Sequence, residues 1–152
     1  MWYTEVVMTI RTLPELIRRF QQVTSSSHKQ NAQWATNLLS RYQGDDWKQW
    51  VAYRSVPFVL YKDEGNEDAS YALEMFHWSH APHAFPIRLL PRAHYTFRVL
   101  AGEVLLSSRN HRMGVFREHP YSIHHDATYR YPLRMEGQVN VTSTVLIFRQ
   151  AR

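Results

Sequence analysis

The spacing of apolar residues changes once along the chain, near residue 54, and this change limits the folds that are available. Before it, apolar residues recur at the three- and four-residue spacing of amphipathic helices. After it, β-branched and aromatic residues alternate with polar ones, as in strands. A chain of 152 residues with 44% hydrophobic and 20% charged residues fits one globular domain. We therefore predict a single mainly β domain, 1–152, with a helical cap over 1–53 and a β-barrel over 54–152.

Three helices are predicted in the first part of the chain. The segment "TLPELIRRFQQV" begins with Thr12 as an N-cap and has Glu15 three residues later, as in a capping box. The segments "NAQWATNLLSRY" and "DDWKQWVAY" predict a second and a third helix, the latter starting near Asp45 or Asp46. Because all three precede the strands, we expect them to cover one face of the β structure.

About seven short strands are predicted after residue 54. The segments are "VPFVLYK", "SYALEMFHW", "HYTFRVLAGEVLLSS", "GVFRE", "YSIHHD", "TYRYPL" and "QVNVTSTVLIFRQ". The breaks between them are "DEGNEDA", "LAGE", "SRNHR" and "MEGQ". Short strands at this spacing indicate a sandwich or a barrel.

The order of several motifs resembles the cysteine dioxygenase family of cupins over nearly the whole chain. The motifs are "TEVVMTIRTLPELIRRF", "DDWKQWVAY", "YKDEGN", "EMFHWSHAPHAFPI", "VLAGEVLL" and "TVLIF". The resemblance implies a cupin, jelly-roll-like β-barrel capped by about three helices. It also implies an iron held by three histidines, two of them in a His-x-His before the glycine hairpin, and the oxidation of a thiol by dioxygen. A His-x-Tyr pair on the last strand is implied to recognise the substrate.

The positions that would carry this chemistry hold other residues. The His-x-His position reads Arg88-Leu89-Leu90, the third ligand's position holds Tyr129 followed by Arg130, and the terminal pair becomes Leu146-Ile147-Phe148. Iron(II) needs imidazole or carboxylate donors, whereas guanidinium has no lone pair and leucine has no donor atom. We therefore expect a cupin without a metal or other cofactor, with iron present only if the ligands have been relocated.

Other histidines keep a relocated metal site open as an alternative. His80 and His83, and the adjacent pair His124 and His125, have spacings that point the two side chains to opposite faces of a strand. His94 pointing inward beside one of the latter pair is the arrangement that remains. In that case the chain would be an iron-dependent thiol dioxygenase.

The replacements predict instead an apolar cavity that binds a small anionic or amphipathic molecule. If Arg88 points inward, its charge needs a partner, either Glu74, Glu103 or an anionic ligand. If it points outward, it is a surface arginine. The predicted ligand-binding residues are Arg88, Trp78, Arg130, Leu90, Leu146 and Phe148. Trp78 matches a pocket tryptophan of the family, although a tryptophan in a barrel is more often part of the core.

Two kinds of function fit such a cavity, and a third does not use it. The domain is either a non-catalytic binding module, that is a pseudoenzyme, or a metal-independent isomerase, cyclase or lyase. In the second case His94 and Tyr129 would be the acid and base, and the alternative is that both only pack in the fold. The third reading is a basic protein-interaction module.

Composition limits the partners and the compartment. The net charge is +5, but the basic residues are scattered, which disfavours nucleic acid. The absence of cysteine excludes disulfides and thiolate metal sites, and no apolar run approaches the length of a membrane span. The first residues do not resemble a signal peptide. We therefore expect a cytoplasmic protein without a membrane partner, as a monomer or a homodimer.

Overall fold

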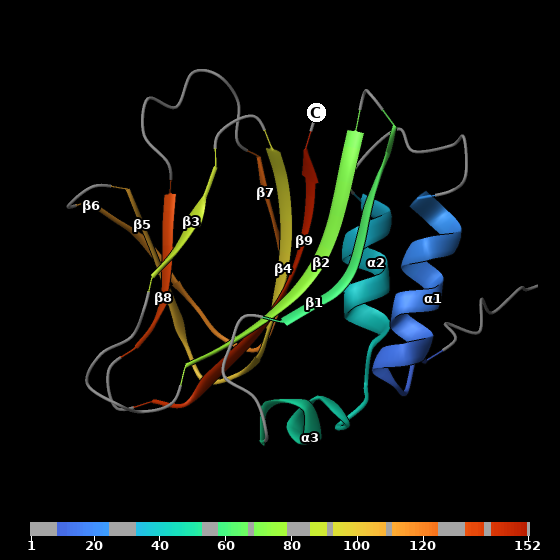
Figure 1. Ribbon diagram of the computed structural model, residues 1–152. Helices are drawn as coiled ribbons and strands as arrows, with labels where there is room; N and C mark the ends of the chain where they lie inside the picture. Colours follow the sequence, from blue (N-terminus) through green and yellow to red (C-terminus); the bar gives the residue numbers. More distant parts are fainter. Residues whose placement is uncertain are drawn as a thin grey trace, which may run out of the picture.

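The computed structural model has its helices first and its strands after them (Figure 1). It describes residues 9–24, 33–52, 58–66, 69–78, 86–90, 93–108, 111–124, 133–138 and 141–151. The helices are α1 (Leu13–Thr24), α2 (Gln33–Arg41) and α3 (Trp47–Ala52). The strands are β1 (Phe58–Asn66), β2 (Ala69–Trp78), β3 (Ile87–Leu89), β4 (Ala93–Ala101), β5 (Val104–Ser108), β6 (His111–Phe116), β7 (Pro120–His124), β8 (Leu133–Gly137) and β9 (Ser143–Ala151).

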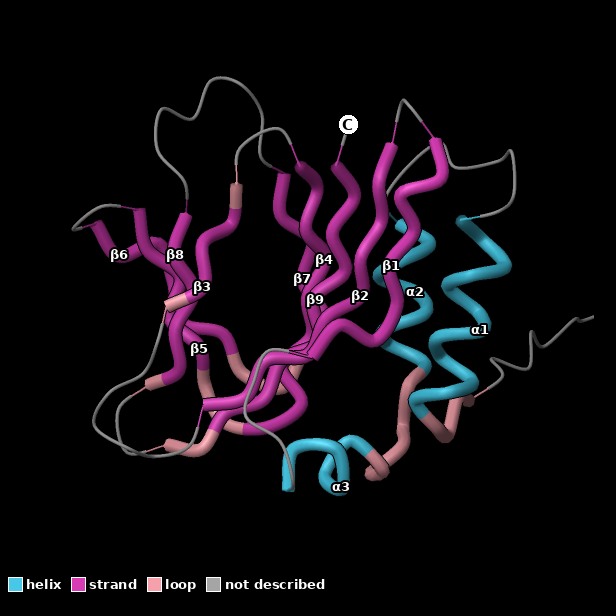
Figure 2. The backbone as a smooth tube through the Cα atoms, in the orientation of Figure 1, coloured by secondary structure: helices cyan, strands magenta, loops and turns pink. Residues whose placement is uncertain are grey.

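The strands form two antiparallel sheets that face each other. One has the order β1-β2-β9-β4-β7 and the other the order β3-β8-β5-β6. Apart from β1, these are the strand orders of a jelly roll, in which two Greek keys make a two-sheet sandwich. Within the described part of the chain no backbone ladder joins the sheets, so the predicted barrel is not closed by hydrogen bonds (Figure 2).

The helices α1 and α2 lie against the outer face of the five-stranded sheet (Figure 1). Phe20 of α1 and Trp34 of α2 surround Phe148 of β9, with ring centroids 4.6 and 5.0 Å from that ring. The prediction that the helices cover one face of the β structure is therefore confirmed for α1 and α2. None of the described helices has the length and apolar character that a membrane span requires.

Two side chains fix the start of α1. The backbone N–H of Glu15 donates to Oγ1 of Thr12 at 3.2 Å, which confirms Thr12 as the N-cap. Asp46 accepts the N–H of Leu13 at 2.7 Å and, with its other oxygen, the hydroxyl of Tyr42 at 2.6 Å. Burial and the nearby Asp46 raise the pKa of Tyr42, so its hydroxyl keeps the proton that it donates. This contact ties α1 to the segment that follows α2.

A second core fills the space between the sheets, and one end of that space is tightly packed. Trp78, Phe97, Val104, Met135 and Val145 belong to this core. A Cβ atom added at Gly137 of β8 would lie 2.7 Å from Cβ of Trp78 on β2. Glycine is therefore required for the close approach of the two strands.

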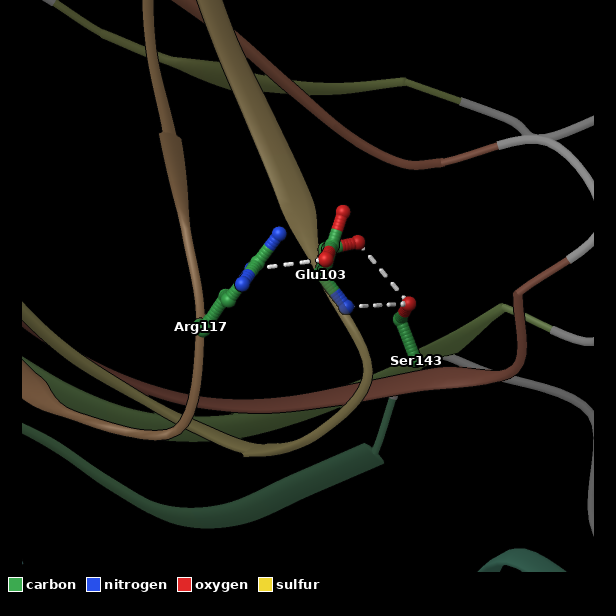
Figure 3. Close-up of polar contacts among 3 residues, drawn as sticks. All are labelled: Glu103, Arg117 and Ser143. Atoms are coloured by element: carbon green, nitrogen blue, oxygen red, sulfur yellow. Dashed lines mark hydrogen bonds and ion pairs between the residues drawn. The ribbon is translucent and has the colours of Figure 1, made fainter.

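The β4–β5 hairpin is held at this same end by polar contacts (Figure 3). Ser143 Oγ accepts the N–H of Glu103 at 3.1 Å and donates to its carbonyl at 2.8 Å. Arg117 Nε pairs with the Glu103 carboxylate at 2.7 Å. Gly102 has a φ of 74°, which favours glycine at the turn.

The strands differ from the prediction at several places. β3 was not predicted, and β1 continues to Asn66, into the predicted break "DEGNEDA". β8 begins where the predicted strand "TYRYPL" ends, and it contains most of the predicted break "MEGQ". The glycine at position 137 does not mark a turn. It is needed inside the strand because Trp78 packs closely against it.

Candidate functional site

A small cleft opens between the two sheets beside β3. Its polar lining consists of Glu74, Arg88, Tyr95 and Arg149. Its apolar lining consists of Phe76, Ile87, Leu89, Leu90 and Ile147. The cavity volume is about 70 Å³, well below the roughly 300–1,000 Å³ of drug-sized sites, so it suits a small group or molecule.

The register of the five-stranded sheet decides which residues reach the cleft. Arg149 of β9 lies directly opposite Tyr95 of β4, and Ile147 lies opposite Glu74 of β2. Directly opposite residues of an antiparallel pair project from the same face of the sheet. Leu146 and Phe148, which flank Ile147 in β9, therefore project from the other face.

Arg149 is the most distinctive group of the cleft. Its side chain is half-buried, and its Nε is buried without a hydrogen-bond partner. Among the described residues no ion pair to Arg149 is present. A buried N–H without an acceptor costs about 1–3 kcal/mol, more for a charged group. An anion in the cleft would provide the missing acceptor.

Glu74 is the acidic group of the cleft. Burial raises the pKa of Glu74, and the positive charges of Arg149 and Lys62 oppose this shift without cancelling it. No hydrogen bond or ion pair joins the side chains of Glu74 and Arg149, both of which lie in the described part of the structure. The cleft therefore holds a carboxyl group and a guanidinium that are not paired with each other.

Tyr95 connects the two sheets at the floor of the cleft. Its hydroxyl accepts the backbone N–H of Leu90 at 2.8 Å. Burial raises the pKa of Tyr95, while the Leu90 N–H and the charge of Arg149 lower it. The phenol is neutral near pH 7 and holds the end of β3 beside β4.

Arg88 lies on the outer face of its sheet and reaches only the rim of the cleft. It is exposed and lies directly opposite Arg134, whereas its neighbours Ile87 and Leu89 turn toward the core. The inward orientation is therefore wrong for this side chain. Of its two proposed protein partners, Glu103 pairs with Arg117 instead.

Leu90 is also on the rim. It lies just after β3 and is 51% exposed, and its backbone N–H is bonded to Tyr95. A leucine with this exposure borders the cleft from outside and does not fill it. Its predicted contact with a ligand stays a prediction.

The prediction that Leu146 and Phe148 face the interior is wrong. Both are buried in the core formed with the helices. The sequence "TVLIF" is apolar throughout because β9 is covered on both faces, by the helices and by the second sheet. Such a strand gives no alternation from which its inward side can be read. Arg149, which faces the cleft from this strand together with Ile147, was missed for the same reason.

His94 does not reach the cleft. It alternates with Ala93 and Tyr95, which belong to the core between the sheets, so it projects from the opposite face of β4. The predicted acid-base role of His94 in the cavity is therefore wrong. The alternation in "HYTFRVL" carried this information, because Tyr95 and Phe97 are apolar and His94 and Arg98 are not.

The other predicted site residues have separate outcomes. Trp78 is buried between the sheets, and the centroid of its ring lies 6.4 Å from that of Phe76. It therefore packs behind Phe76, which lines the cleft, and does not line the cleft itself. Tyr129 and Arg130 lie outside the described residues, so their roles stay predictions.

The described residues contain no group of three histidine, aspartate or glutamate side chains that could hold a metal ion. His80, His83 and His125 lie outside these residues, as does the side chain of His124. The expectation of a domain without iron accordingly stays a prediction.

Comparisons with known proteins give structural neighbours only. No family model matches the sequence, and no curated protein does. A cupin superfamily protein from Desulfitobacterium hafniense is 9% identical, with a TM-score of 0.43 over 66% of this chain and 80% of that one. The Cnp3 cupin domain of Schizosaccharomyces pombe is 8% identical, with a TM-score of 0.42 over 63% and 64%. An RmlC-like cupin from Methanocaldococcus jannaschii is 10% identical, with a TM-score of 0.39 over 65% and 82%.

Similarities of this size do not establish a family. None of these neighbours is described as a cysteine dioxygenase, so the family resemblance seen in the motifs has no support from them. The jelly-roll assignment rests on the strand order of the two sheets. The chain is a mainly β, two-sheet domain with helices packed on one outer face.

Proposed function

We propose that this domain is a cupin-like binding module that holds a small carboxylate, or a molecule bearing one, in the cleft between its sheets. The observation that supports the proposal is the half-buried guanidinium of Arg149, whose Nε is buried and lacks an acceptor. Guanidinium binds carboxylates through paired hydrogen bonds, and such charge-assisted bonds are about twice as strong as neutral ones.

The apolar walls define the rest of the ligand. Phe76, Ile87 and Ile147 line the cleft beside Arg149. A short aliphatic group would bury apolar surface against them at roughly 25 cal/mol per Å². The ligand class is therefore a small amphipathic acid, bound by its carboxylate and its short hydrocarbon part.

Glu74 makes the binding sensitive to pH. Since burial raises the pKa of Glu74, lowering the pH makes it neutral sooner than an exposed glutamate. A neutral Glu74 no longer repels a bound carboxylate and can donate a hydrogen bond to it. We expect binding to strengthen as the pH falls toward this raised pKa, as long as the ligand itself stays ionised.

Calorimetric titration with propionate, butyrate and the uncharged propionamide tests the proposal. We expect the two carboxylates to bind and the amide not to. Arg149→Met should weaken carboxylate binding at least about tenfold, because a charge-assisted pair contributes about 1.5–3 kcal/mol. The matched control is Arg134→Met, which removes an exposed arginine outside the cleft. Equal affinity for propionate and propionamide, or unchanged affinity in Arg149→Met, would contradict the proposal.

A further inference from the structure

The outer face of the four-stranded sheet carries a row of arginines, of which only Arg88, at one end, also borders the cleft. The residues of one cross-strand row are Arg112 on β6, Ser107 on β5, Arg134 on β8 and Arg88 on β3, each opposite the next. All three arginines are exposed. We call these four residues the arginine row, and we propose that it binds an acidic, partly apolar segment of another protein.

The arginine row crosses four strands, so its length follows from the sheet. Adjacent strands lie about 4.8 Å apart, which places Arg88 about 5 Å from Arg134 and Arg134 about 10 Å from Arg112 at the backbone. The helices lie on the five-stranded sheet, at the far side of the molecule (Figure 1). No described helix or strand covers the arginine row.

The arginines have no partners within the described part of the protein. No hydrogen bond or ion pair joins Arg88, Arg112 or Arg134 to another described residue. Arg88 and Arg134 are directly opposed, and like charges in this position destabilise a sheet. In the isolated domain this repulsion between the two guanidinium groups is not compensated. A row of carboxylates from a partner would remove it.

Apolar side chains next to the row favour a protein as the partner. Val115 of β6 lies opposite Leu105 of β5. Leu105 is two residues before Ser107, and Val115 is three residues after Arg112 because the register shifts between the two pairs. Val115 is 39% exposed, and Met113, at the irregularity between the two rows, is 46% exposed. Arginine and methionine are enriched in protein–protein interfaces, while the phosphates of nucleic acids gain nothing from aliphatic contacts.

The positive charge of the chain makes a second copy of the same protein an unsuitable partner for this face. The net charge is +5, and the acidic side chain next to Arg134 on this face, Glu136 opposite Leu105, is half-buried. Two copies facing each other would oppose their arginine rows. The chemistry that complements this face is a segment with several carboxylates and leucine- or valine-sized side chains.

Fluorescence anisotropy with a short labelled peptide of alternating glutamate and leucine tests the inference. The binding variant is R112E/R134E, and the control is R11E/R18E, which changes the net charge equally at exposed positions outside this sheet. At low ionic strength we expect R112E/R134E to weaken binding about tenfold and the control to change it far less. Neither arginine of the binding variant lines the cleft, so carboxylate binding there should be unchanged.

Two further probes separate a specific site from general electrostatic attraction. A peptide of alternating glutamate and serine has the same charge, and we expect it to bind several-fold more weakly than the glutamate–leucine peptide. Val115→Ser should remove most of this difference. Arg112→Ala alone, at the edge strand, gives a milder variant whose binding should be intermediate.

Three results would overturn the inference. One is an equal loss of binding in R112E/R134E and R11E/R18E, and another is no difference between the two peptides. The third is a DNA duplex that binds more tightly than the glutamate–leucine peptide and depends on the same arginines, which would assign the face to nucleic acid.

Discussion

At the scale of single residues, the side of the sheet on which a side chain lies decides its role. Arg149 reaches the cleft, whereas Phe148, one residue earlier, packs against Phe20 of α1. Glu74 likewise faces the cleft, between Leu73 and Met75, which pack toward the helices. The polar groups of the cleft are thus separated from a purely apolar core by the thickness of one sheet.

Glu74→Gln should stabilise the protein near neutral pH. Because the pKa of Glu74 is raised in the folded state above its ordinary value of 4.5, folding favours the protonated form. The favourable contribution of Glu74 is complete below about pH 4.5 and is lost as the pH rises through the raised pKa. Glutamine mimics the protonated form throughout.

Thermal unfolding of the wild type and Glu74→Gln, measured between about pH 3.5 and about pH 8, tests this effect. The two proteins should unfold at similar temperatures at the acidic end, and the variant should unfold at the higher temperature near pH 7. A wild type that is the more stable protein near pH 7 would show that Glu74 is held there by a favourable contact of its carboxylate.

At the scale of elements, a single arginine joins a strand to the end of a helix. Arg98 of β4 donates to the carbonyl oxygens of Leu39, at 2.6 Å, and of Tyr42, next to the last turn of α2. The last carbonyls of a helix have no partner inside it. Arg98 therefore both ends α2 and fixes it on the sheet.

Arg98→Met should lower the free energy of unfolding by about 1–3 kcal/mol, because it leaves two half-buried carbonyls without a donor. Urea denaturation followed by circular dichroism measures the change. Arg134→Met is the control, since this exposed side chain makes no hydrogen bond or ion pair with the described residues, and its variant should stay within about 0.5 kcal/mol of the wild type. Equal stabilities of the two variants would show that Arg98 is not the anchor of α2.

The packed end of the sandwich depends on a glycine. Gly137→Ala places a methyl group 2.7 Å from Cβ of Trp78, so β2 and β8 must move apart. We expect a loss of about 1–3 kcal/mol in unfolding free energy, by the cost of overpacking. Gly114→Ala is the control, because its nearest neighbour is the tip of the Phe116 ring at 3.2 Å, which can shift. A smaller loss for Gly137→Ala than for Gly114→Ala would contradict the close contact.

At the scale of the whole molecule, the sequence predicted the order of the elements better than their pairing. Capping residues and helical periodicity located α1, and the glycine of "LAGE" located the β4–β5 hairpin. The three-residue strand β3 is too short to produce a periodic signal. The separation into two sheets depends on contacts between distant segments, which local patterns do not record.

The candidate site could be predicted only in part. A cavity with an arginine was expected, and the structure has one, but Arg88 lines only its rim, and the guanidinium with a buried nitrogen is that of Arg149, which was not predicted. The difference arises because β9 is apolar on both faces and because counting from a family motif fixes a position in the chain, not the side on which it projects. The order of the motifs thus indicated the region of the site and two residues at its rim, Arg88 and Leu90, and it misplaced Leu146 and Phe148.

A crystal structure of the protein grown with propionate tests the central claim most directly. We predict a carboxylate in the cleft, with its oxygens at about 2.7–2.9 Å from the guanidinium of Arg149 and its ethyl group against Phe76 and Ile147. A cleft in which Arg149 is paired with a carboxylate of the protein, or in which histidine nitrogens surround a metal ion, would contradict it.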